Sequence, residues 1–131
     1  AFPDPKIILV AIAYAIGAHG IMTLNDFKAL KGDKALGINS LPVQLGPERA
    51  AKIACYVMAI PQILVVTFLF AWGLTTFSIF ILLLVIGQIL AMRRLLSDPE
   101  KFAPWYNSTG VLMFVSGMMV CALGLSQAVA Q

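Results

Sequence analysis

Long apolar runs separated by short polar connectors dominate the chain. Four of these runs reach the roughly 20 predominantly apolar residues that a transmembrane helix requires. We therefore expect helices at about residues 6–27, 48–72, 76–96 and 105–128, with the longest connector at residues 25–47. The pattern predicts an all-α fold in which residues 1–131 form a single transmembrane helical domain, a polytopic membrane helix bundle.

The composition agrees with this pattern. Of 131 residues, 60% are hydrophobic and 11% are charged, and the mean hydropathy is +0.92. About a quarter of the residues of an ordinary soluble domain are charged, so the composition excludes that class. The net charge of +3 comes from basic residues in connectors close to the membrane. Such residues favour lipid headgroups or phosphates, and because none interleaves with aromatic residues we expect no nucleic-acid partner.

The distribution of basic residues predicts the orientation in the membrane. The connector from Lys28 to Lys52 holds five of them, the connector from Arg93 to Lys101 holds three, and the turn at residues 72–76 holds none. Cytoplasmic connectors are enriched in lysine and arginine. We therefore expect both charged connectors on the cytoplasmic side and both termini on the opposite side.

Charged residues concentrate between Asp26 and Lys34, at the end of the first apolar run. Asp26 and Asp33 are seven residues apart, as are His19 and Asp26, so a continuous helix would place all three on one face. Carboxylates interleaved with Lys28 and Lys34 suit a Mg²⁺ ion shared with substrate phosphates, whose remaining charge the lysines would neutralise. A basic cytoplasmic loop, with aspartates that add solubility, explains the same charges without a site.

Two further polar positions open the last predicted helix. Tyr106 and Asn107 would lie on the same side of the membrane as the aspartates, where they could line a substrate entrance. Trp105 and Tyr106 also form a typical interfacial aromatic belt. Both interpretations remain open.

About twenty consecutive positions around the aspartates closely resemble the second aspartate-rich motif of UbiA-type intramembrane prenyltransferases, in their chlorophyll and bacteriochlorophyll synthase branch. The matching segments are Asn25-Asp26-Phe27-Lys28, Gly32-Asp33, Leu36-Gly37-Ile38, Ser40-Leu41-Pro42-Val43 and Leu45-Gly46. The apolar segments that follow resemble the same branch in order and spacing. The four expected helices thus resemble the last four of the nine-helix UbiA-type fold.

The resemblance implies transfer of a phytyl or geranylgeranyl group from its diphosphate to the propionate of a chlorophyllide or bacteriochlorophyllide. It implies a plasma or photosynthetic membrane, intracytoplasmic or thylakoid, as the location. Asp26 and Asp33 would be catalytic residues that bind Mg²⁺ and the diphosphate. Asn25 would be an orienting amide, and Lys28 and Lys34 would contact the diphosphate.

One part of the family pattern has no counterpart in the sequence. Members carry a first aspartate-rich motif, and the remaining acidic residues form no such cluster: Asp4, Glu48, Asp98 and Glu100. We therefore do not expect this chain alone to be an active enzyme. It would be a carboxy-terminal portion of a longer enzyme, half of a split enzyme that needs a chain supplying the missing helices, or a remnant.

Two other functions are compatible with the same features. One is a non-catalytic subunit that binds pigment or helps to assemble a photosynthetic complex, with His19 as a ligand of the chlorin magnesium. A histidine hydrogen-bonded within the bundle explains that residue equally well. The other function is a UbiA-type enzyme acting on a quinone or haem precursor, although the sequence of the motif favours the chlorin branch: Asn25-Asp26-Phe27-Lys28.

Overall fold

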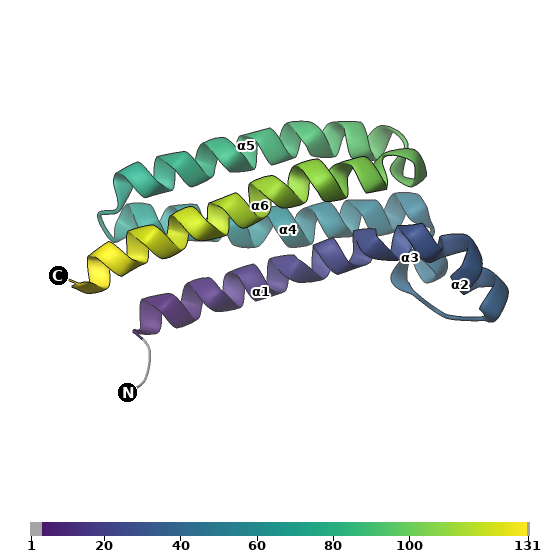
Figure 1. The fold of residues 1–131 in the computed structure, drawn as a ribbon, viewed down its shortest axis with the longest axis horizontal. Helices are drawn as coiled ribbons and strands as arrows, with labels where there is room; N and C mark the ends of the chain where they lie inside the picture. Colours follow the sequence, from purple (N-terminus) through teal and green to yellow (C-terminus); the bar gives the residue numbers. More distant parts are fainter. Residues whose placement is uncertain (1–3, 131) are drawn as a thin grey trace.

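The computed structural model of the chain describes residues 4–130, and the side chains of residues 4–27 and 32–127. Four long helices lie side by side and form a bundle (Figure 1). All four are long and apolar enough to cross a membrane, and the described residues contain no strand. The all-α, multi-pass helix bundle expected from the sequence is thereby confirmed. The helices are α1 (Pro5–Asn25), α4 (Pro47–Ala71), α5 (Thr75–Ser97) and α6 (Pro99–Ala130).

The two ends of the bundle differ in content. Helix α1 begins, α6 ends and α4 turns into α5 at one end, where the Lys6 ammonium lies 5.4 Å from the centre of the Trp72 ring. The other end carries the α5–α6 junction and three short elements, η1 (Asp26–Ala29), α2 (Leu30–Leu36) and α3 (Leu41–Leu45). We call this second end the motif end, because it contains the aspartates.

The polar connector and the start of the last helix differ from the sequence expectation. The connector expected at residues 25–47 contains a 3₁₀ turn and two short helices, and α6 begins at Pro99 rather than near residue 105. Proline suits the first helical position, where its missing N–H has no partner to lose. Pro104 follows inside the helix, close to the helix start, where it removes the hydrogen bond to the carbonyl four residues earlier.

Two apolar clusters fill the bundle, and a pair of glutamines separates them. The cluster nearer the motif end includes Met58 and Ala91, and the other includes Val65 and Val85. Between them, the side-chain amides of Gln62 and Gln88 are fully buried, and each donates a hydrogen bond to the other, at 3.0 and 2.8 Å. The Gln62 amide also donates to the Met58 carbonyl at 2.8 Å. This pair joins α4 to α5 inside the membrane and fixes their register.

Removing one member of the glutamine pair should cost more than removing both. Gln62→Leu leaves the Gln88 amide buried without its partner, which we expect to lower the free energy of unfolding by about 1–2 kcal/mol. Gln62→Leu combined with Gln88→Leu should be close to neutral, because no polar group is then left unpaired. Thermal unfolding in detergent measures both. Thr67→Val is the control, since this exposed hydroxyl bonds only to the Ile63 carbonyl of its own helix; equal losses in the single and double variants would contradict the prediction.

Candidate functional site

The aspartates lie where the first long helix ends and the chain changes helix type. Helix α1 stops at Asn25, two residues before the expected end, and Asp26 opens the 3₁₀ turn η1. A 3₁₀ helix has three residues per turn rather than 3.6. The seven-residue coincidence of Asp26 and Asp33 on one uninterrupted α-helix therefore does not apply, and Asp33 reaches the motif end on the separate helix α2.

A helix-terminating turn holds the backbone at Asp33. The Ile38 N–H donates to the Asp33 carbonyl at 2.8 Å, and the Gly37 N–H donates to the Lys34 carbonyl at 3.4 Å. Gly37 has φ +74°, the left-handed conformation that this pair of bonds requires and that glycine adopts most easily. The segment Leu36-Gly37-Ile38 thus ends α2 within one turn of Asp33 and fixes the backbone of that aspartate.

The predicted metal ligands are partly buried. Asp26 and Asp33 have intermediate exposure, and among the residues that the structure describes no three His, Cys, Asp or Glu side chains gather as a potential metal centre. Mg²⁺ is commonly held by one or two carboxylates, and water and substrate phosphates complete its coordination. Two aspartates therefore suit a magnesium ion that is bound together with a diphosphate.

Of the two lysines predicted to contact phosphate, Lys34 has a described side chain. Lys34 is exposed in the last turn of α2, where a positive charge is favourable beside the helix C-terminus. Lys28 belongs to residues 28–31, whose side chains lie outside the described part of the structure. Lys34 is therefore the candidate phosphate contact that the structure locates.

The structure pairs two residues that the sequence suggested separately. The Asn107 Nδ2 on α6 donates to the Asn25 Oδ1 at the end of α1, at 2.6 Å. The Asn107 Oδ1 is buried and has no partner among the described residues. A side-chain hydrogen bond thus joins α1 to α6 immediately before Asp26.

The other two candidate residues occupy different environments. Tyr106 is completely buried among apolar side chains of the bundle, and its hydroxyl has no hydrogen-bond partner within the described residues. His19 is exposed, about two turns before Asp26 along α1. Tyr106 thus contributes to the core that supports the motif end, and the His19 side chain faces outward from the bundle.

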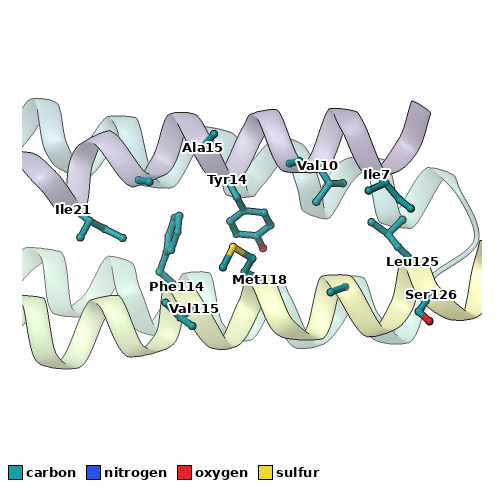
Figure 2. A pocket seen from close by; sticks show the side chains of 13 residues that line it. Ile7, Val10, Tyr14, Ala15, Ile21, Phe114, Val115, Met118, Leu125 and Ser126 are labelled. Atoms are coloured by element: carbon teal, nitrogen blue, oxygen red, sulfur yellow. The ribbon is translucent and has the colours of Figure 1, made fainter. Parts of the chain in front are cut away.

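An apolar groove between α1 and α6 was not foreseen from the sequence. It has a volume of about 950 Å³, and its walls come from residues 7–21 of α1 and residues 114–126 of α6. The Tyr14 and Phe114 rings project from opposite helices and meet edge to face, 5.3 Å between centres (Figure 2). Small residues at helical spacing leave room for the groove on the α1 side: Ala11, Ala15 and Ala18.

The groove and the motif end follow one another along the axes of α1 and α6. An apolar chain could occupy the groove while an anionic headgroup, with its metal ion, sits at the aspartates. This division matches an amphiphile that carries a phosphate group.

The chain is similar in sequence to known proteins over most of its length. The bacteriochlorophyll synthase 33 kDa chains of Cereibacter sphaeroides and Rhodobacter capsulatus are 58% and 53% identical to this chain over 123 residues each. In both cases 94% of this chain is covered, but only 41% and 40% of the relatives. The chloroplastic chlorophyll synthase of Oryza sativa subsp. japonica is 37% identical over 123 residues, or 93% of this chain and 33% of its own length.

The chain therefore spans about two fifths of the length of the bacteriochlorophyll synthase chains that it matches. No solved structure matches it significantly. The sequence pattern of the UbiA prenyltransferase family extends over residues 1–118. With that match across most of its length, the chain belongs to the UbiA prenyltransferase family.

Proposed function

We propose that this chain is the carboxy-terminal portion of a bacteriochlorophyll or chlorophyll synthase. In the proposed reaction, a prenyl group, phytyl or geranylgeranyl, passes from its diphosphate to the propionate of a chlorophyllide or bacteriochlorophyllide. The identity of 58% over 94% of the chain to a bacteriochlorophyll synthase chain carries the proposal. An apolar groove that runs toward a pair of aspartates supports it.

The reaction breaks one bond and forms another. The bond between C1 of the prenyl group and a diphosphate oxygen breaks, and the electron pair leaves with the diphosphate. A propionate oxygen then bonds to the allylic C1, which yields the ester and free diphosphate. Mg²⁺, when bound, supplies positive charge to the departing diphosphate.

The residues of this chain would bind and orient the reactants. Asp26 and Asp33 hold the metal together with the diphosphate, Lys34 contacts phosphate oxygens, and Lys28 remains a candidate for the same task. The apolar helices surround the isoprenoid and exclude water that would quench an allylic cation. Negative charge thus develops at the polar end of the bundle while the carbon chain stays in apolar surroundings.

A second set of carboxylates would come from the rest of the enzyme. The family's first aspartate-rich motif is absent from this sequence, so we propose that further helices, in the same polypeptide or in a partner chain, complete the metal site. The membrane would be photosynthetic, with the motif end facing the cytoplasm. The basic connectors at that end support this orientation.

Chelation tests the function directly. The full-length synthase containing this segment, purified in detergent, is assayed for esterification of bacteriochlorophyllide with geranylgeranyl diphosphate. We expect esterification to fall to background with EDTA and to return with added Mg²⁺, because the departing diphosphate then regains its counter-charge. This chain without the remaining helices should be inactive.

Two results would contradict the proposal. Esterification that is insensitive to chelation would remove the metal from the mechanism. Bound pigment without turnover, in a preparation that contains all helices, would favour a pigment-binding subunit instead.

A further inference from the structure

The Asn25–Asn107 hydrogen bond lies between the groove and the aspartates. The groove residues closest to the motif end are Ile21 on α1 and Phe114 on α6. At a rise of 1.5 Å per residue, Asn25 lies about 6 Å beyond the first and Asn107 about 10 Å beyond the second. Asp26 follows at once, so the two amides mark the boundary between the apolar groove and the charged motif end.

The direction of this hydrogen bond decides what Asn25 can offer a ligand. One amide atom of Asn107 pairs with Asn25, and the other is buried without a partner. Exchanging oxygen and nitrogen in both amides would preserve the bond but bury an unpaired NH₂ group. An unpaired buried N–H is rarer in proteins than an under-satisfied oxygen, which favours Asn107 as the donor and the Asn25 oxygen as the acceptor.

The Asn25 oxygen is therefore engaged, whereas its NH₂ group has no partner in the described structure. A side-chain amide oxygen is a suitable ligand for a hard cation, and an NH₂ group is a suitable donor to an anionic oxygen. With its oxygen held by α6, Asn25 is set to act as a donor.

We propose that Asn107 is a positioning residue, which holds the Asn25 amide so that its NH₂ group is available to an oxygen of the departing diphosphate. The inference rests on the proposed prenyl transfer and assigns α6 a part in it. Negative charge on that oxygen grows as the C1–O bond breaks, so a donor held in place stabilises the transition state more than the bound substrate. Asn107 thus acts on turnover through Asn25.

Removal of the Asn107 side chain should therefore lower kcat more than it raises KM. For Asn107→Ala in the full-length synthase we expect kcat to fall about tenfold, with KM for geranylgeranyl diphosphate changed less than about twofold. Asn107→Asp should cost more, because its carboxylate faces the Asn25 oxygen and draws the NH₂ group toward α6. Ser108→Ala is the control, since that exposed hydroxyl bonds only to carbonyls of its own helix, at Pro104 and Trp105.

A double-mutant cycle separates positioning from packing. If Asn107 acts through Asn25, Asn107→Ala should change kcat less than about twofold in an Asn25→Ala background. Equal losses in both backgrounds would overturn the proposal. The proposal would also be overturned if Asn107→Ala lowered the melting temperature and an apolar core variant with the same fall in melting temperature lost the same fraction of kcat. The lost activity would then follow from lost stability.

A binding measurement keeps this inference distinct from the proposed function. Calorimetry with inorganic diphosphate and Mg²⁺ reports the Asn25–Asn107 coupling without turnover, because the leaving-group oxygen carries its full negative charge in the free diphosphate. If the wild-type protein does not esterify bacteriochlorophyllide, the proposed function fails while coupled diphosphate binding still supports the positioning role. Additive effects of the two substitutions on diphosphate affinity would then refute that role.

Discussion

Asp26→Asn is expected to lower kcat for prenyl transfer by about a thousandfold in the full-length synthase, and Asp33→Asn by a similar factor. Each substitution keeps the size of the side chain and removes its charge. The site then loses part of the negative potential that holds Mg²⁺ beside the diphosphate, which becomes a poorer leaving group. Initial rates of bacteriochlorophyllide esterification at saturating substrate measure the effect.

The acidic residue Asp98 provides a matched control. It lies at the same end of the bundle, is exposed, and accepts a weak 3.4 Å hydrogen bond from the Lys101 backbone N–H. Asp98→Asn should leave kcat within about twofold, because an exposed charge away from the metal contributes little. Raising the Mg²⁺ concentration should recover part of the loss in the aspartate variants, since it compensates for weaker binding. Esterification that survives both aspartate substitutions would refute their assignment as metal ligands.

The lengths of the apolar runs were sufficient to predict the four helices and the bundle. A membrane leaves no water for unpaired backbone groups, so a long apolar run has few alternatives to a helix, and the ends of α1, α4 and α5 lie close to the expected residues. The start of α6 was harder to predict. Pro104 resembles a helix boundary, yet residues 100–103 before it continue the helix back to Pro99.

The candidate site could be predicted only in part, because sequence spacing describes neighbours within one helix. The aspartates and Asn25 were identified from the motif, and the turn at Gly37 explains why Leu36-Gly37-Ile38 accompanies them. The hydrogen bond between Asn25 and Asn107 joins residues 82 positions apart, and the groove depends on how α1 and α6 pack. Such features arise from the arrangement of helices and leave no local pattern.

Close packing of α1 on α4 also holds the motif in place, and Gly20 lies at one of the close contacts. A Cβ atom at Gly20 would lie 2.6 Å from both the Ala54 carbonyl oxygen and the Met58 Cγ atom. The carbonyl belongs to the backbone of α4 and cannot rotate away as a side chain can. Small residues at such contacts let membrane helices approach closely, and Asp26 lies only about 9 Å further along the α1 axis.

Gly20→Ala should therefore separate the two helices at the motif end, and Gly117→Ala should not. A Cβ at Gly117 would meet its neighbours at ordinary distances of 3.6–3.9 Å, so both variants gain the same helix propensity and only Gly20→Ala introduces a clash. We expect the free energy of unfolding to be about 2–3 kcal/mol lower for Gly20→Ala than for Gly117→Ala, as measured by denaturation in detergent. Because Asn25 and Asp26 follow on the displaced helix end, kcat should fall together with stability. Equal stability of the two variants would contradict the prediction, because it would mean that α1 and α4 do not approach each other closely at Gly20.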